Sequence, residues 1–286
     1  MAESTTTPIV INSPSSALAK PQVLISEIVS DLVRCRELTW VLFQRDLKAQ
    51  FRQSYLGYVW LFLPPVLTTA VWLFLNQQQV ISVADTDIPY PVFVITGSVI
   101  WQTFVRLLQS PVTAFNAGKP VFMKLKVPPE AFIAAGSARA IFEFLLYCLV
   151  LVPTFLFFSI TPTWTIVLVP FVILTLLAFG TAIGLLLVPL GSLYSDIQQA
   201  IPISMGFLMY LAPVVYPPPE SGISSQLIHL NPMTPVLMSV RDLLTTGSLT
   251  YFWPTMALLP VSLVLIVVSM LGLRVAMPHM IARAGM

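Results

Sequence analysis

Arg139 and Glu143 are the two side chains in this sequence that could take part in chemistry inside an apolar environment, because of their spacing and surroundings. They lie four positions apart in a stretch of apolar residues, so a helix would place them on one face. Ionisable groups at membrane depth are costly and usually face a protein interior or an aqueous cavity. Two interpretations stay open: a structural ion pair that holds two spans together, and a polar point on a pathway through the membrane.

Side chains for hydrolytic or metal chemistry are missing from the apolar stretches. His229 and His279 lie in separate segments outside those stretches, so no general base is available there for a nucleophile or a metal. The phosphate-binding pattern G-x-x-x-x-G-K-[ST] is also missing, because Gly118-Lys119 has neither the upstream glycine nor a following Ser or Thr. We therefore expect no catalytic residue, metal or cofactor in this chain, and no ATP hydrolysis by the chain alone.

The composition indicates that membrane-spanning helices position Arg139 and Glu143. The chain has 286 residues, of which 57% are hydrophobic and 9% charged, with a mean hydropathy of +0.87, whereas soluble domains carry about 25% charged residues. A net charge of +2 gives no reason to expect nucleic-acid binding. We predict an all-α polytopic membrane protein with six crossings, each near the ~20 residues that a helix needs: Tyr58–Asn76, Pro91–Leu108, Ala140–Ile160, Trp164–Leu190, Ile197–Tyr216 and Phe252–Leu273.

The basic residues predict the orientation, because Lys and Arg concentrate on the cytoplasmic side of membrane proteins. All 14 of them except Arg106, Arg139 and Arg241 fall in residues 1–52, in the link between spans two and three, or in the C-terminal tail. The opposite links carry Asp85, Asp87, Glu220 and Asp242. We therefore expect both termini in the cytoplasm and a multi-pass protein of the plasma membrane. Arg106, late in span two, is expected to snorkel to the surface and is given no role.

The N-terminal segment divides into two parts. Residues 1–24, rich in Ser, Thr and Pro, are predicted to be a disordered cytoplasmic tail. Residues 25–56 are predicted to form an amphipathic helix in the cytoplasmic headgroup layer, with Gly57 marking the turn into the first span. An aromatic and apolar stripe recurs there at helical spacing beside a basic one: Trp40, Phe43, Leu47, Phe51 and Tyr55, and Arg45, Lys48 and Arg52. An ordinary amphipathic helix packed on protein is the alternative.

The link between spans two and three, residues 116–130, alternates basic and apolar residues before Pro128-Pro129 stops any continuing helix. Exposed apolar residues on a cytoplasmic link favour the docking of a partner. The alternative is that the apolar residues dip into the membrane interface while the lysines follow the positive-inside rule. The residues singled out in this link are Asn116, Lys119, Phe122, Lys124, Lys126 and Glu130.

Residues 217–251 are too few for two crossings and too apolar for a free loop. Asn231-Pro232 and Pro235 break them into short pieces, which predicts two short re-entrant helices that protein buries. A hydrophobic cap on the outer surface is the alternative. In span four, Gly180 and Gly184 form a small-xxx-small pattern that permits close contact between helices.

Four stretches resemble the permease subunits of ATP-binding-cassette exporters for polysaccharides and polyol phosphates, the O-antigen, capsule and teichoic-acid group. They are FQRDLK (43–48) with SYLGYVW (54–60) and Pro64, PYPVF (89–93) with Gly97 and Trp101, KLKVPPE (124–130), and APVVYP (212–217) with NPM (231–233) and RDLL (241–244). The resemblance runs from about Glu37 to the end of the chain. It departs from the family pattern at Pro129, where arginine is usual, and at Ser195-Asp196, where an Arg-Asp pair is usual.

The resemblance implies an ABC-2 type transmembrane domain over residues 25–286. Such a permease would work as a homodimer with two separately encoded cytoplasmic ATPase subunits, which bind the ATP and magnesium. The link 116–130 would then be the coupling helix that receives the ATPase movement, and the helix over 43–55 would meet the lipid headgroup of a polyprenyl-linked glycan. The segment 217–251 would gate the exit. The residues implied for this gate are Pro213, Tyr216, Asn231, Pro232 and Arg241.

Two other functions remain open on sequence grounds. A drug- or lipid-exporting transporter of the ABC-2 type shares the six-span plan but would match less well at residues 43–60 and 124–130. A membrane-embedded glycosyltransferase or lipid phosphatase would need carboxylates or a histidine near a membrane surface. The function that we expect is export of a polysaccharide or lipid-linked glycan across the bacterial inner membrane, driven by the separate ATPase.

Overall fold

The structure, a computed structural model, describes residues 28, 30–52, 54–80, 86, 88–122, 124–125, 127–219 and 221–284. The predicted tail (1–24), the acidic residues Asp85, Asp87 and Glu220, and Lys126 lie outside the described residues. Every regular element within those ranges is a helix, which confirms the predicted all-α class. The elements are α3 (Arg36–Phe51), α4 (Val59–Gln77), α5 (Tyr90–Phe122), α6 (Glu130–Phe157), η1 (Trp164–Leu168), α7 (Val169–Leu193), α8 (Ser195–Leu208), η2 (Met209–Leu211), α9 (Ile223–Leu230), α10 (Met233–Leu244) and α11 (Phe252–Ala284).

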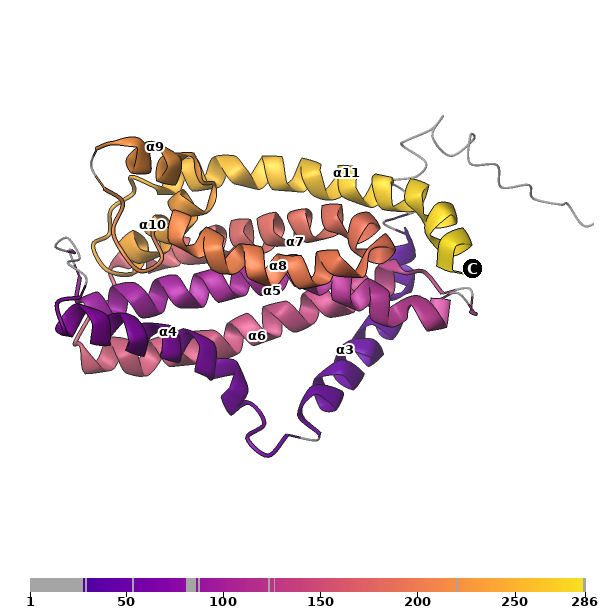
Figure 1. Cartoon of the computed structure of the whole chain (residues 1–286), viewed down its shortest axis with the longest axis horizontal. Coiled ribbons are helices and arrows are strands. Elements are labelled where there is room, and N and C mark those ends of the chain that lie inside the picture. Colours follow the sequence, from indigo (N-terminus) through magenta and orange to yellow (C-terminus); the bar gives the residue numbers. More distant parts are fainter. Residues whose placement is uncertain are drawn as a thin grey trace, which may run out of the picture.

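The long helices lie side by side in one bundle with two different ends (Figure 1). The short helices α9 and α10 gather at one end together with the beginning of α5, and this end is called the outer end. The end of α5, the beginning of α6 and the C-terminal part of α11 gather at the opposite, inner end. Segments predicted to face opposite sides of the membrane therefore lie at opposite ends of the bundle.

Within the part of the chain that the structure describes, five helical segments are long and apolar enough to cross a membrane, which confirms a polytopic membrane protein: Val59–Gln77, Tyr90–Phe122, Glu130–Phe157, Trp164–Leu193 and Phe252–Met277. The remaining predicted span, 197–216, is the 14-residue helix α8 followed by the three-residue turn η2. Together they reach about 27 Å, slightly less than a hydrocarbon core of about 30 Å. The helix ends there because Ala212, in an extended conformation, precedes Pro213. A sixth crossing by α8 stays a prediction.

Helix α5 is much longer than predicted, and this corrects the position of three residues. The apolar stretch ends near Leu108, but the helix continues through polar residues to Phe122. Its 33 residues reach about 50 Å, which exceeds the hydrocarbon thickness by about 20 Å. Asn116, Lys119 and Phe122 therefore lie in α5 and not in the link, which is confined to residues 123–129.

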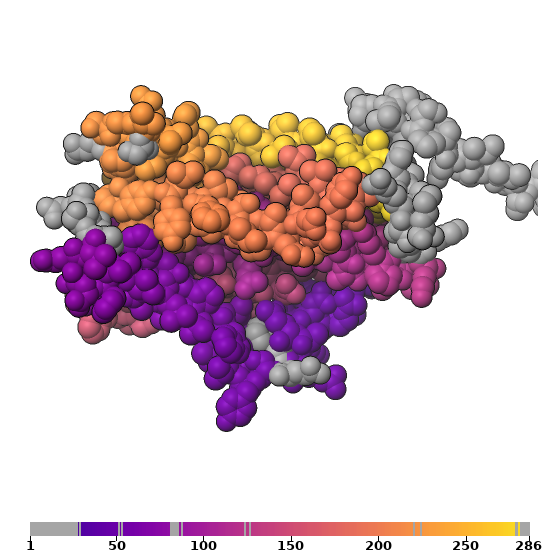
Figure 2. Space-filling view, viewed as in Figure 1, coloured from indigo at the N-terminus to yellow at the C-terminus, as the bar shows by residue number. Residues whose placement is uncertain are grey.

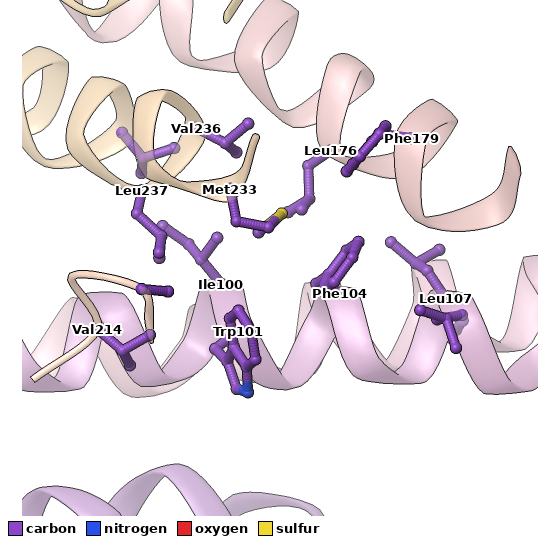
Figure 3. Close-up of a cluster of buried hydrophobic side chains, with 14 of the residues drawn as sticks. Ile100, Trp101, Phe104, Leu107, Leu176, Phe179, Val214, Met233, Val236 and Leu237 are labelled. Atoms are coloured by element: carbon purple, nitrogen blue, oxygen red, sulfur yellow. The ribbon is translucent and has the colours of Figure 1, made fainter. Parts of the chain in front are cut away.

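The core of the bundle forms around α5, whose most apolar stretch of 18 residues is 78% buried. Figure 3 shows Ile100, Phe104 and Leu107 of α5 facing side chains of α7 and α10, whereas Trp101 points away from them. The rings of Phe104 and Phe179 stack with centroids 5.8 Å apart. The labelled partners from the other segments are Leu176 and Phe179 of α7, Met233, Val236 and Leu237 of α10, and Val214. The short helix α10 is thus part of the same core as the long helices.

Glycines of α7 let it approach α5 closely, as the small-xxx-small pattern predicts. A Cβ atom added at Gly180 would lie 2.7 Å from Cβ of Leu107, and one added at Gly184 would lie 2.7 Å from the carbonyl oxygen of Leu108. Backbone atoms cannot swing away as a flexible side chain can. The contact at Gly184 therefore depends on the absence of a side chain.

Replacing Gly184 with alanine is expected to lower the midpoint of thermal unfolding in detergent, because α5 and α7 must separate to admit the methyl group. Overpacking of this kind costs about 1–3 kcal/mol. Gly272→Ala is the matched control, since nothing lies within 4 Å of a Cβ atom at that position in α11. A helical Gly→Ala change without a clash should leave the midpoint unchanged or raise it. Equal midpoints for the two variants would contradict the proposed contact.

Candidate functional site

At the inner end, two side chains of α5 bind the last carbonyl groups of α7. Asn116 Nδ2 donates to the Gly191 carbonyl at 2.8 Å, and Lys119 Nζ donates to the Ser192 carbonyl. The carbonyl groups of a final helical turn have no partner within their own helix, and a cation there also complements the helix dipole. These two residues of the predicted coupling segment therefore join α5 to α7, and their polar atoms face protein.

The predicted coupling segment divides into a packed part and an exposed part. Phe122 lies between Phe115 and Phe132, with ring centroids 5.1 and 5.9 Å away. Lys124 and Leu125 are exposed, and 58% of the surface of Leu125 is open. An exposed leucine beside a lysine at the tip of a link is the kind of surface that a partner protein covers.

Glu130 is not available to a partner, because it is buried in an ion-pair cluster. Its Oε1 accepts a hydrogen bond from Arg274 Nε of α11 at 2.9 Å, and Arg274 also pairs with Asp31. The cluster joins the N-terminal segment, the start of α6 and the last helix. Desolvation raises the pKa of the neighbouring Cys35 thiol, and the carboxylates of Asp31 and Glu130 add to the rise, so the thiol stays protonated at neutral pH.

Helix α3 packs on α6 with one face, as the alternative interpretation of this segment expects. Leu42 is buried against Ala131, Phe132 and Ala135. The rings of Phe43 and Phe142 meet edge to face, with their centroids 6.1 Å apart. The opposite face is open: Trp40, Arg45, Lys48 and Arg52 are exposed. Contact of this open face with lipid headgroups stays a prediction.

The turn between α3 and α4 carries three exposed aromatic side chains. Gly57 has a φ of +50°, a left-handed conformation that glycine adopts without steric cost, and its N–H donates to Ser54 Oγ at 3.0 Å. This confirms the predicted turn. Around it Tyr55, Tyr58 and Trp60 are exposed. Figure 2 shows the surface of α3 and α4 projecting from the body of the bundle, and aromatic side chains of this kind are common at the headgroup level.

At the outer end, Arg241 of α10 is buried, with 2% of its surface exposed. Its Nε and Nη2 donate to the Phe93 carbonyl at 3.2 and 3.0 Å, and Nη2 also donates to the Val214 carbonyl at 2.6 Å. Its Nη1 donates to the Pro213 carbonyl, and the guanidinium lies 3.6 Å from the centre of the Phe93 ring. Arg241 therefore joins α10 to the start of α5 and to the turn 212–216.

The other residues of the predicted gate surround the same junction. Asn231 Nδ2 donates to the Leu211 carbonyl at 3.0 Å, and its Oδ1 accepts from the Met233 N–H at 3.0 Å, where α10 begins after Pro232. Tyr216 donates to the Tyr210 carbonyl, and the Tyr90 hydroxyl donates to the Val215 carbonyl at 3.0 Å. The segment 217–251 contains the two predicted short helices, of which α10 is buried in the core while α9 exposes Ile223, Leu227 and Leu230.

Between the two ends, Glu143 is the centre of a polar cluster that joins α3, α5 and α6. Its carboxylate lies 3.6 Å from Arg139 Nε and 3.4 Å from Arg106 Nε, and Gln50 Nε2 donates to it at 3.4 Å. The predicted contact between Arg139 and Glu143 is therefore present. Because both residues belong to α6, however, it is Arg106 of α5 that makes the contact between two spans.

Sequence reasoning missed Arg106 and Arg274. Arg106 was expected to reach the membrane surface, but its side chain turns to the buried Glu143, a carboxylate that two arginines share. Arg274 was counted as part of a tail, but α11 continues to Ala284 and holds it against Glu130. The signal that could have found both contacts was the presence of two acidic residues, Glu130 and Glu143, in otherwise apolar surroundings.

The family model of the ABC-2 type transporter matches residues 37–245. The chain is 28% identical to the O-antigen export system permease protein RfbA of Myxococcus xanthus over 84% of this chain and 92% of that protein. It is 26% identical to an RfbA of Klebsiella pneumoniae over 75% of this chain and 83% of that protein. It is 27% identical to the polysialic acid transport protein KpsM of Escherichia coli over 62% of this chain and 68% of that protein.

Proposed function

The chain belongs to the ABC-2 type transporter family, and from this premise we propose that it is the permease subunit of a polysaccharide exporter. The observation that carries the proposal is the similarity to RfbA of M. xanthus, an O-antigen export permease, which extends over 84% of this chain and 92% of that protein. The similarity to a polysialic acid transport protein supports a polysaccharide, whatever its sugars, as the cargo. The chain itself is a transport subunit that carries no enzymatic step.

Deleting the gene is expected to remove a polysaccharide from the cell surface and to leave it inside the cell. The measurement is glycan immunoblotting or sugar analysis of surface and intracellular fractions, with the gene restored from a plasmid as the control. A deletion strain with an unchanged surface glycan and a new sensitivity to drugs would instead favour a drug exporter of the same family. Loss of the glycan from both fractions would point to a step in its synthesis.

The energy source that we propose is a separate ABC ATPase that binds the inner end of the bundle. It would bind the ATP and magnesium, and two copies of it would act with two copies of this chain. We infer that the exposed tip of the α5–α6 link, with Lys124 and Leu125, receives the ATPase, and that Lys126, next in the sequence, adds its charge to this contact. Both termini then lie in the cytoplasm, and the protein lies in the bacterial inner membrane. A polyprenyl-linked glycan would reach it from the cytoplasmic leaflet of that membrane.

Replacing Lys124 and Lys126 together with glutamate is expected to weaken co-purification of the ATPase at least about tenfold, because charge reversal at the centre of a small interface is repulsive. The matched control is the double replacement of Arg34 and Arg36 with glutamate, which reverses the same amount of charge at exposed positions of the N-terminal segment. The measurement is the ATPase recovered with an affinity-tagged permease from detergent-solubilised membranes. Equal recovery from both variants would remove the link from the proposed contact.

A further inference from the structure

The α5–α6 link is supported on both sides, because the end of α5 packs tightly against the start of α6. A Cβ atom added at Gly118 of α5 would lie 2.6 Å from Cγ of Phe132 of α6. The ring of Phe122, the last residue of α5, also contacts the ring of Phe132, with centroids 5.9 Å apart. Close-packed side chains have low compressibility and transmit strain. A force on the exposed tip of the link therefore reaches the end of α5.

Two side chains at the end of α5 hold the last turn of α7. Asn116 and Lys119, here called the inner clamp, lie three positions apart and so share one face of α5. They donate to the carbonyl groups of Gly191 and Ser192, which belong to the final turn of α7. A Cβ atom at Gly191 would lie 2.5 Å from Cγ1 of Val112, so the two helices are also in close contact there. The orientation of the last turn of α7 is therefore determined by α5.

Helix α8 leaves α7 directly beside the inner clamp. A single residue, Tyr194 in an extended conformation, separates the two helices, and Gln198 Nε2 of α8 lies 3.5 Å from the Gly191 carbonyl oxygen. Figure 1 shows α8 running back from the inner end toward the outer end of the bundle. All 14 residues of α8 belong to the described part of the chain, and only Ile201 among them is buried. The position of α8 therefore depends strongly on its attachment at the inner end.

Space for a movement of α8 is present between α8 and α5. A cavity of about 150 Å³ lies there, lined by Val112 and Thr113 of α5 and by Gln198, Ile201 and Pro202 of α8. Protein interiors are otherwise close-packed, with few voids larger than a water molecule. Helix α8 can therefore change its angle to α5 by closing or widening this cavity, without compressing side chains that are already in contact.

We propose that the inner clamp carries movement of the α5–α6 link into α8, so that Asn116 and Lys119 are positioning residues for transport. The proposal rests on the proposed function, since the movement would come from the ATPase bound to the link. When the link moves, the end of α5 moves with it, and the inner clamp moves the last turn of α7. Helix α8, attached there by one residue, then changes its angle to α5. Small shifts of one packed helix against another are a common element of conformational transitions.

The functional test compares the parent chain with the double variant Asn116→Leu and Lys119→Met, which removes both donors and keeps the side chains similar in size. We expect the variant to co-purify with the ATPase, and the complex to hydrolyse ATP as the parent complex does. Surface glycan in the deletion strain should nevertheless fall at least about tenfold, the effect of losing one charge-assisted hydrogen bond. Lys119→Arg, which keeps a cationic donor, should export more glycan than Lys119→Met. ATP hydrolysis and export that fall in parallel, or unchanged export, would overturn the proposal.

Thr165→Val is the matched control, because it also removes a donor from a carbonyl group in the last turn of a helix. Thr165 Oγ1 donates to the Leu243 carbonyl of α10 at 2.8 Å, at the opposite end of the bundle. This variant should export glycan as the parent chain does.

Hydrogen–deuterium exchange of the purified full chain tests the same contacts without ATPase or glycan. The amides of residues 194–201 should exchange at least about tenfold faster in the double variant, because α8 loses its fixed attachment. They should exchange at the parent rate in Thr165→Val. Equal exchange of these amides in the parent chain and the double variant would overturn the proposal, whether or not the gene deletion removes a surface glycan. The exchange experiment and the deletion therefore separate a failure of this proposal from a failure of the proposed function.

Discussion

Replacing Arg241 with methionine is expected to abolish the folded outer end of the protein and with it export of the surface glycan. The buried guanidinium donates to the carbonyl groups of Phe93, Pro213 and Val214, and methionine can donate to none of them. Each buried carbonyl left without a donor costs about 1–3 kcal/mol, so the loss is several kcal/mol at one junction. The measurement is the midpoint of thermal unfolding in detergent together with surface glycan in the deletion strain.

Gly97→Ala tests the same junction without removing a charge. A Cβ atom there would lie 2.0 Å from Arg241 Nη2 and 2.3 Å from the Val214 carbonyl oxygen, so the arginine must leave its place. We expect the double variant Gly97→Ala with Arg241→Met to have a midpoint of thermal unfolding close to that of Arg241→Met alone. Both changes break the same set of contacts, so their losses should not add. Gly206→Ala is the control, since its Cβ would meet nothing within 4 Å. Additive losses would show that the two residues act separately.

Glu143→Gln is expected to have the second large effect, because it leaves two partly buried arginines without their shared counter-charge. Removing one partner from a fully buried ion pair costs about 3–5 kcal/mol. The side chain of Glu143 is 1% exposed, but those of Arg139 and Arg106 are 31% and 38% exposed, so solvent screening makes the loss smaller than that. We expect a low yield of monodisperse protein and a clear fall in the midpoint of thermal unfolding, read by size-exclusion chromatography and differential scanning fluorimetry.

Arg139→Gln should behave in the opposite way in the same assay. It leaves Arg106 and Glu143 as a matched pair between α5 and α6, so the midpoint should change little. Combining it with Glu143→Gln should recover part of the loss, since only one guanidinium then lacks a partner. A Glu143→Gln protein as stable as the parent chain would contradict the assignment of this carboxylate as the common counter-charge.

Features that depend on local pattern could be predicted from the sequence. The apolar stretches indicate the positions of the long helices, Gly57 indicates the turn before α4, and Asn231-Pro232 indicates the break between α9 and α10. The helical spacing of Arg139 and Glu143 brings them into contact. In each case the chain within a few residues determines the geometry, so no knowledge of distant segments is needed.

Features that depend on distant segments could not be predicted. Asn116 and Lys119 look like parts of a polar link, and only the end of α7 next to them explains why α5 continues through them. Arg241 looks like an exposed charge on an outer loop until the carbonyl groups of two other segments surround it. Helix α8 is shorter than its apolar stretch because the backbone at Ala212 and Pro213 leaves the helical conformation.

The contact of Arg274 with Glu130 and Asp31 has a consequence for how the protein is made. A growing chain leaves the ribosome from its N-terminus, so both carboxylates are synthesised long before the arginine that neutralises them. The inner end can therefore reach its final arrangement only after α11 has been synthesised. A prematurely terminated copy that ends before Arg274 would lack the counter-charge of both carboxylates, so its inner end could not take the arrangement of the full-length chain.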